Sequence, residues 1–456
     1  MDTALLNRLI DREQECFART HPKSAAAWAA GRQHYLFGGP SHWMRRWQGG
    51  FPIYVDTAKG AHVRDIDGHD YVDFCLGDTG AMCGHAPDAV TAAALRQLER
   101  GATTMLPTEE SLWVGAELSR RFGLTYWTLT TSATDANRAA IRMARMITGR
   151  IKVLVFSGCY HGGVEEAHVQ LDQGRMTLRN MIHANGVTHG DVCKVVEFND
   201  AAALRAALAD QDVACVLTEP LMTNFGMIPV AGGFHAALRE ATRATSTVLI
   251  IDETHTISCG PGGYTGLHGL TPDMLVAGKA IAGGIPCGIV GVSETVAQRM
   301  WQLVPWLNPR ERQSAHLGFG GTLAGSALSV ATMRAVLEHV LIDSNYAQMI
   351  AAAAKLAADA GDIIARENLP WHVAQTGARA EIMFMPLPPR NGADVIAARN
   401  GLLETLLHAH YLNHGVLVTP FHTMFLMCPA TSGADVDRHT AIFASFVARI
   451  RAEGLL

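Results

Sequence analysis

The chain has 456 residues, of which 48% are hydrophobic, and a net charge of −5 at pH 7. This length and composition predict a large core divided among two or three domains. The weak acidic charge argues against nucleic acid or an anionic membrane as a partner and favours a small molecule. No apolar stretch reaches the length of a membrane span, and the N-terminus lacks the pattern of a secretory signal.

The cysteines and histidines show no metal-binding pattern. Nine cysteines are scattered along the chain and none forms a CxxC pair, which predicts free thiols in a reducing cytoplasm. The densest histidine group, His408, His410 and His414, falls at the predicted end of a helix without the spacing of a known metal motif. We therefore expect a cytoplasmic protein with no metal site.

The predicted elements change in character along the chain. Residues 1 to about 36 are predicted to be helical, and residues 53–74 alternate around Lys59-Gly60 and Asp67-Gly68 as in a small antiparallel meander. Helical Ala-rich patterns then alternate with short apolar runs at 127–130, 152–156, 214–220, 248–252 and 274–279. Such alternation predicts a three-layer α/β domain with a mostly parallel sheet sandwiched by helices.

After about residue 325, long helices dominate, with one strand-like run at 415–420. We expect a large α/β domain over residues 76–325. Residues 1–75 and 326–456 are expected to form together a smaller α+β domain from both ends of the chain.

Two charged residues follow directly after predicted buried strands. The apolar run 248–251 leads into Asp252, which either caps a helix or faces a positive group at the ligand-binding edge of the sheet. Lys279 ends the next run, where Asp273 and Ala280 exclude a nucleotide P-loop. A Schiff base to an aldehyde cofactor is the other common use of such a lysine.

Two further strand ends carry residues that suit the same kind of ligand. Thr131 to Thr134 open a helix whose N–H groups suit a phosphate, although an ordinary Ser/Thr cap explains the same residues. Tyr160 lies on a glycine-rich turn, where it either stacks on a planar ring or packs in the core. Together with Asp252 and Lys279, these features predict pyridoxal 5′-phosphate (PLP), with Asp252 paired to the protonated pyridine nitrogen.

Several motifs resemble the class III aminotransferases, also called the omega or ornithine-type group. They are TSATDAN (131–137), SGCYHGG (157–163), IIDETH (250–255), GKAIAGGIPCG (278–288) and GGTLAGSAL (320–328). The resemblance covers about residues 35–435 and is strongest to the branch with glutamate-1-semialdehyde aminomutase and β-phenylalanine aminotransferase. It implies a fold-type I PLP-dependent transferase.

The resemblance also implies roles for individual residues. Lys279 and Asp252 would be catalytic, and the residues holding the cofactor would be Ser132, Ala133, Thr134, Tyr160, Asp252, Thr254, Lys279 and Thr322. Thr322 corresponds to a threonine that reaches the phosphate of the neighbouring subunit, so a homodimer with shared active sites, or a larger oligomer, is implied.

On the substrate side, the resemblance points to an arginine after Gly38-Gly39, which Arg45 fits better than Arg46. Bidentate binding of a carboxylate is the specific use of such a side chain, and a solvated surface is the alternative. Trp43 lines either an apolar pocket or a dimer contact.

From the sequence we expect an aminotransferase that moves an amino group from an amine or β-amino acid to a keto acid. The alternatives are an intramolecular aminomutase or racemase on the same scaffold, and a non-catalytic cofactor-binding protein. The sequence assigns no role to Glu219 or His255.

Overall fold

The computed structural model describes residues 2–179, 189–303 and 317–456. The chain divides into two compact units, which are described separately. One comprises Met1–Pro87, Ser344–Pro388 and Ala398–Leu456, and the other comprises Asp88–Asp343 and Pro389–Ala397. The domain limits expected from the sequence, after residues 75 and 325, stay a prediction.

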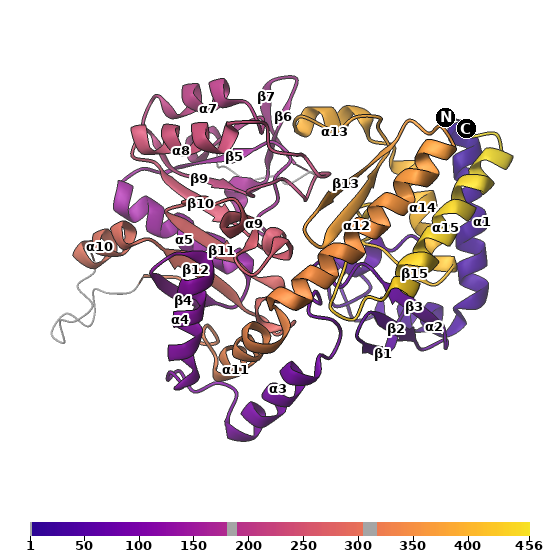
Figure 1. The fold of residues 1–456 in the computed structure, drawn as a ribbon, viewed down its shortest axis with the longest axis horizontal. Coiled ribbons are helices and arrows are strands. Elements are labelled where there is room, and N and C mark those ends of the chain that lie inside the picture. The colour runs from indigo at the N-terminus through magenta and orange to yellow at the C-terminus, as the bar shows by residue number, and fades with distance from the viewer. Residues whose placement is uncertain (1, 180–188, 304–316) are drawn as a thin grey trace. The chain divides into compact units, whose positions relative to one another are not determined.

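The second unit is built on a seven-stranded sheet with the strand order β4-β12-β11-β10-β9-β5-β8 (Figure 1). Its strands are β4 (Tyr126–Thr130), β5 (Lys152–Phe156), β8 (Cys193–Val196), β9 (Val213–Thr218), β10 (Val248–Asp252), β11 (Met274–Ala277) and β12 (Gly288–Val292). Only β12 pairs antiparallel with its neighbours β11 and β4 within this sheet. The mostly parallel sheet predicted from the apolar runs is confirmed, and the runs at 152–156 and 248–252 match β5 and β10 residue for residue.

Helices cover both faces of this sheet. From β4 the chain passes through α5 (Ala133–Thr148) to β5, which lies towards the other end of the strand order. From β8 it returns in the opposite direction, through α7 (Ala201–Leu208) to β9 and through α8 (Phe234–Ala244) to β10. Because such crossovers are right-handed, α5 lies on one face and α7 and α8 lie on the other. The strands between them are almost fully buried, which explains their unbroken apolar runs.

The other elements of this unit surround the sheet. The helices are α3 (Asp88–Arg100), α4 (Glu110–Phe122), η2 (Glu165–Ala167), α6 (His189–Val192), η3 (Thr256–Cys259), α9 (Gly263–Leu267), η4 (Lys279–Ala282), α10 (Glu294–Leu303), α11 (Ala327–Ala335), η5 (Val336–Val340) and α13 (Gly392–Ala398). The strands β6 (Val169–Asp172) and β7 (Arg175–Leu178) form a separate antiparallel hairpin.

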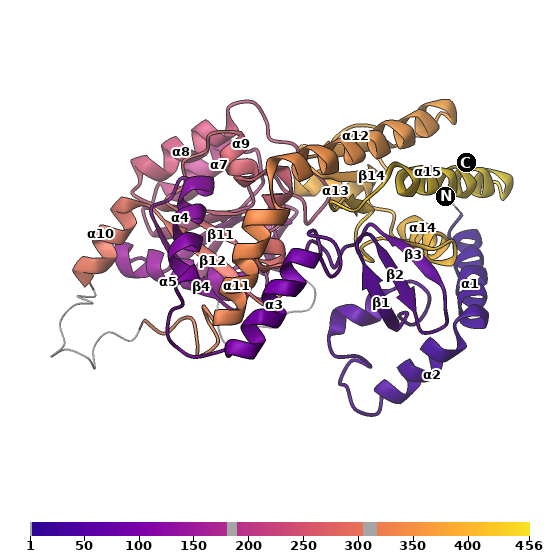
Figure 2. The same cartoon turned by 60° about the horizontal axis from the view of Figure 1, so that its bottom comes forward.

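The first unit combines two small sheets with helices, as expected for an α+β domain (Figure 2). Its strands are β1 (Val55–Lys59), β2 (His62–Asp65), β3 (Asp70–Asp73), β13 (His372–Thr376), β14 (Arg379–Met383), β15 (Val416–Leu417) and β16 (Met424–Leu426). Its helices are α1 (Thr3–Thr20), α2 (Pro22–Gly31), η1 (His42–Arg46), α12 (Asp343–Arg366), α14 (Gly401–Asn413) and α15 (Gly433–Ala452). The predicted meander is confirmed as β1-β2-β3, and β15 from the C-terminal segment pairs with β3.

None of the helices in the described ranges combines the length and the apolar character that crossing a bilayer requires.

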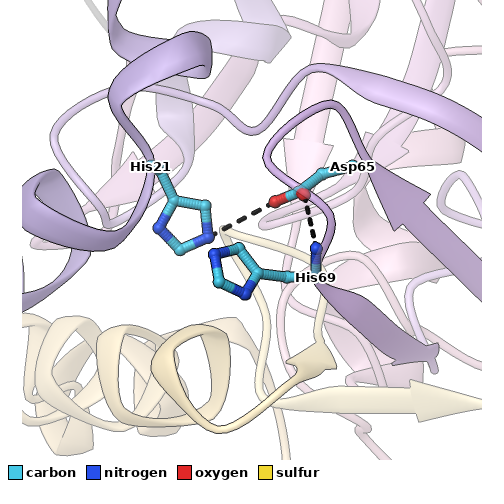
Figure 3. A group of neighbouring side chains, drawn as sticks. All are labelled: His21, Asp65 and His69. Atoms are coloured by element: carbon cyan, nitrogen blue, oxygen red, sulfur yellow. Dashed lines mark hydrogen bonds and ion pairs between the residues drawn. The ribbon is translucent and has the colours of Figure 1, made fainter.

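A buried polar cluster fastens the end of α1 to the meander (Figure 3). His21 Nδ1 donates to the carbonyl of Phe17 at 2.8 Å, while its Nε2 lies 2.6 Å from the Tyr71 hydroxyl and 3.3 Å from Asp65 Oδ2. The main-chain N–H of His69 donates to the other Asp65 oxygen at 2.8 Å. One nitrogen or oxygen atom from each of His21, Asp65 and His69 lies within 4.8 Å of the others, as the ligands of a metal would. The hydrogen bonds of this cluster account for the arrangement without a metal.

The His21 ring is a source of acid sensitivity. Burial disfavours the imidazolium and outweighs the attraction of Asp65, so the pKa of His21 lies below its ordinary value of 6.5. The folded state therefore resists a proton that the unfolded chain binds, and the contribution of His21 to stability is lost as the pH falls below 6.5.

We expect His21→Gln to reduce the slope with which the free energy of unfolding declines as the pH falls below 6.5. The slope, measured by urea denaturation over a pH series, is compared because the substitution also changes stability at neutral pH. His34→Gln, which alters an exposed histidine, is the matched control. Equal slopes for wild type and His21→Gln would contradict the assignment.

Candidate active site

The carboxyl ends of β9, β10 and β11 lie side by side and carry the charged residues predicted from the sequence. Asp252 is the last residue of β10 and pairs with Val276 of β11, three residues before Lys279. Glu219 follows the last residue of β9. Because these strands are parallel, all three residues meet at one edge of the sheet, which is where ligands bind in open α/β folds.

Asp252 is a buried carboxylate with donors on both oxygens. Its Oδ2 accepts from Asn137 Nδ2 at 2.8 Å and from His161 Nδ1 at 2.9 Å, and its Oδ1 accepts from the main-chain N–H of Thr254 at 3.0 Å. Only 4% of Asp252 is exposed, so without these donors the charge would be very costly. Of the two roles that the sequence left open for Asp252, the carboxylate therefore does not act as a helix cap.

Asp252 and His161 form a buried pair in which both side chains are charged. Burial by itself would raise the pKa of Asp252, but the hydrogen bond and charge of His161, with Thr254 and Asn137, bring it below the ordinary value. For His161, burial acts to lower the pKa, and the adjacent Cys159 and the Asp252 carboxylate outweigh it and raise the value to about 10. The site therefore presents an anion at the end of β10, paired with an imidazolium.

Lys279 lies in a strained turn after β11. Its φ angle is 48°, in the left-handed region that a residue with a side chain rarely adopts. A Cβ on the preceding Gly278 would lie 2.7 Å from Ala133 Cβ and 2.9 Å from Ala133 N, so only glycine fits there. Strain of this kind is concentrated at functional sites. The Lys279 amine contacts the ring of His255, with 2.5 Å between Nζ and Nε2.

The predicted phosphate cradle lies at the N-terminus of α5. Ser132 is the N-cap, and its hydroxyl accepts from the Asp135 N–H at 3.2 Å. Ala133 begins the helix and is not among the residues with positive φ, so alanine meets the backbone requirement there. Thr134 Oγ1 accepts from the Gly163 N–H at 3.1 Å. A Cβ on Gly162 would lie 2.0 Å from that hydroxyl, so glycine brings the Tyr160 loop onto the helix end.

The other predicted cofactor residues lie on different segments of the same unit. Tyr160 is half-buried on the loop after β5, and Thr254 is buried just after Asp252. The Thr254 hydroxyl is buried without a hydrogen-bond partner in the part of the chain that the structure describes. Thr322 lies exposed in the turn before α11.

These residues fit PLP. Asp252 offers a buried anion for a protonated ring nitrogen, Lys279 offers an amine at the next strand end, and the α5 N-terminus offers N–H groups for a phosphate. His161 Nε2 and Thr254 Oγ1, buried atoms that have no hydrogen-bond partner among the described residues, are further polar groups near Asp252.

The predicted substrate residues lie in the first unit, on and around η1. Arg45 is exposed. The Arg46 guanidinium lies 5.5 Å from the centre of the Trp43 ring and 5.2 Å from that of Phe421. Burial lowers the pKa of Arg46, and the positive charge of Arg399 acts in the same direction. Arg46 and Trp43 thus contact each other.

Sequence reasoning missed Asn137, His161, His255 and Thr223, which supply the polar contacts around Asp252 and Lys279. A signal existed for two of them. Asn137 is a polar residue on the buried face of α5, and His255 follows Asp252 by three positions within a buried segment.

Comparisons with known proteins agree with this geometry. The aminotransferase class-III family matches residues 43–445. A glutamate-1-semialdehyde 2,1-aminomutase from Bacillus cereus (strain G9842) is 32% identical over 413 residues, covering 87% of this chain and 91% of that protein.

Solved structures are similar over almost the whole chain. A variant of a Pseudomonas aeruginosa PAO1 glutamate-1-semialdehyde-aminomutase, in complex with PMP, is 53% identical with a TM-score of 0.96, covering 98% of this chain and 99% of that one. The β-phenylalanine aminotransferase of Variovorax paradoxus is 25% identical with a TM-score of 0.84, and 98% of each chain is covered. This chain therefore belongs to the class III aminotransferases, a family of fold-type I enzymes whose cofactor is pyridoxal 5′-phosphate.

Proposed function

We propose that this enzyme moves the amino group within a short carboxylated amino aldehyde, the reaction class named for the aminomutases. Amino-group chemistry is supported by one arrangement, Asp252 and Lys279 at adjacent buried strand ends. The intramolecular reaction is supported by the 53% identity to the Pseudomonas aeruginosa aminomutase, against 25% to the β-phenylalanine aminotransferase. The sequence motifs favour transfer between two molecules, whereas the similarity to the aminomutases favours the intramolecular alternative.

In this proposal the residues of the second unit have separate roles. When bound, PLP supplies an aldehyde for a covalent link to Lys279 and a ring that withdraws electrons from the reacting carbon. Asp252 keeps its negative charge beside the ring nitrogen. Lys279, once free, takes a proton from the substrate carbon and returns it elsewhere, as a general base and then an acid. Ser132, Ala133 and Thr134 bind the phosphate through the helix N-terminus.

Three further residues would hold the cofactor and the substrate. Tyr160 and Thr254 are proposed to flank the ring. Arg45 is proposed to bind the substrate carboxylate, because Arg46 lies over the adjoining rings of Trp43 and Phe421 and is poorly placed for a second partner. A charge-assisted contact of this kind fixes one end of the substrate.

A second candidate is transamination between an amine or β-amino acid and a keto acid. The aromatic rings beside Arg46 favour it, since they suit a pocket for a bulkier and more apolar substrate than a short aldehyde. The two candidates share every residue role described above and differ only in where the amino group ends.

We also propose a homodimer in the cytoplasm with shared active sites. Large apolar side chains are exposed on α3, α4, the segment between them and the turn before α11, namely Leu95, Leu98, Met105, Leu106, Leu112 and Leu323. Such a concentration suits a subunit interface. Thr322, next to Leu323, would then reach the partner's phosphate. All nine cysteines are free, in keeping with a reducing compartment.

Reduction of the purified enzyme with borohydride should fix the cofactor to the peptide containing Lys279, as read by mass spectrometry.

Asp252→Asn should retain some cofactor but lower kcat by about 100-fold or more, because a neutral amide stabilises the pyridinium poorly. Asp273→Asn, at the opposite end of the neighbouring strand, is the matched control. Labelling of another lysine, or near wild-type turnover in Asp252→Asn, would overturn the assignment.

The fate of the amino group decides between the two reactions. With an amino aldehyde carrying ¹⁵N at its amine, and pyruvate or 2-oxoglutarate present, we expect the label in the isomerised product and little in alanine or glutamate. Transfer of the label to the keto acid in proportion to turnover, read by mass spectrometry, would establish transamination instead.

Shared active sites predict complementation between two damaged chains. Mixing Lys279→Ala with Thr322→Ala chains under exchange conditions should form hybrids with one doubly damaged site and one intact site, so activity should exceed that of either parent. Lys279→Ala mixed with Asp252→Asn is the control, because both residues serve the same chain's site and no intact site arises. Equal behaviour of the two mixtures, or an active monomer, would refute sharing.

A further inference from the structure

A buried chain of polar groups leads from Lys279 into the interior of the second unit. Lys279 Nζ lies 2.5 Å from His255 Nε2, and His255 Nδ1 lies 3.0 Å from the Thr223 hydroxyl. That hydroxyl donates to Glu219 Oε2 at 2.9 Å, and the Thr223 N–H donates to the same oxygen at 3.0 Å. His255, Thr223 and Glu219 are each at most 3% exposed.

The donors and acceptors along this chain fix the tautomer of His255. Glu219 Oε2 accepts two hydrogen bonds from Thr223, so the single hydroxyl proton of Thr223 points at Glu219. With Glu219 ionised, the Thr223 oxygen accepts from His255, which then carries its proton on Nδ1. Burial raises the pKa of Glu219, and the two hydrogen bonds from Thr223 act against that rise. His255 Nε2 is left with its lone pair directed at the Lys279 amine.

The two histidines of the site therefore have different partners. His161 donates to Asp252 and stabilises its negative charge. His255 faces Lys279 as an acceptor, and its orientation is set on the other side of the ring by Thr223 and Glu219, which lie in the segment after β9. A second group that fixes the tautomer and direction of a histidine is a familiar way to hold a reacting side chain in place.

We propose that His255 is a positioning residue, which holds the amine of Lys279 in one direction through an acceptor lone pair set by Thr223 and Glu219. This deepens the proposed function and rests on Lys279 being its reactive amine. Lys279 has a long side chain with several rotatable bonds, and Lys279 itself occupies a strained backbone position. The acceptor would limit the directions open to the free amine whenever Lys279 is not bonded to the cofactor.

The test compares substitutions that remove the acceptor with ones that retain it. His255→Leu removes the ring's contacts with Lys279 and Thr223, whereas His255→Gln retains an acceptor for Lys279 and a donor for Thr223. Thr223→Val removes the hydroxyl that sets the tautomer, and Thr223→Ser retains it. Ser258→Ala is a control for loss of a buried hydroxyl nearby, because Ser258 donates to the main-chain carbonyl of His255.

The first measurement uses apoprotein and no substrate. The rate at which added PLP becomes covalently bound is followed by absorbance and by borohydride trapping at Lys279. We expect His255→Leu to slow this rate by about tenfold or more, because a misdirected amine attacks less often. His255→Gln should recover most of the rate. Thr223→Val should be slowed, while Thr223→Ser and Ser258→Ala should resemble wild type.

The second measurement is steady-state turnover, in which His255→Leu should lower kcat with little change in KM. A structural role alone would not separate Leu from Gln at one position or Val from Ser at the other. Wild-type rates in His255→Leu, or equal losses in His255→Gln and His255→Leu, would refute the positioning role. Trapping of the wild type at another lysine would instead refute the proposed function, so the two failures are distinguishable.

Discussion

The buried negative charge of Asp252 is the interaction on which the rest of the site depends. An isolated carboxylate in a protein interior is unstable by several kcal/mol unless it is paired and hydrogen-bonded. Its three donors come from α5, from the loop after β5 and from the turn after β10. The need to satisfy one carboxylate therefore ties together three segments that are distant in the sequence, and it places them around the end of β10.

Close backbone approach is the second constraint, and glycines make it possible. Gly278 and Gly162 bring the Lys279 turn and the Tyr160 loop against the first turn of α5, where a Cβ would collide with Ala133 or Thr134. Gly288 does the same for β12, since its Cβ would lie 2.3 Å from the carbonyl of Ser132. The proposed cofactor site is thus a place where strand ends and one helix end meet with no room for extra side-chain atoms.

Much of the fold could be predicted because its signals are local. Unbroken apolar runs identified β5 and β10, and alternation around two turns identified the meander. The strand β12 was harder, because Gly288 and Gly291 lower the strand signal of its sequence. Its glycines are explained only by what they face, Ser132 and the ring of Trp127, and these neighbours are not visible in the sequence.

The sequence by itself determined that Asp252 and Lys279 follow buried strands and that small hydroxyl residues open α5, since each follows from a local pattern. Only the tertiary structure decided which side chains reach them. In the sequence, Asn137 lies 115 residues from Asp252 and His161 lies 91 residues from it, while Lys279 and His255, which are in contact, are 24 residues apart. The physical reason is that strand order and loop conformation decide which side chains share a buried edge, and both depend on packing over the whole sheet.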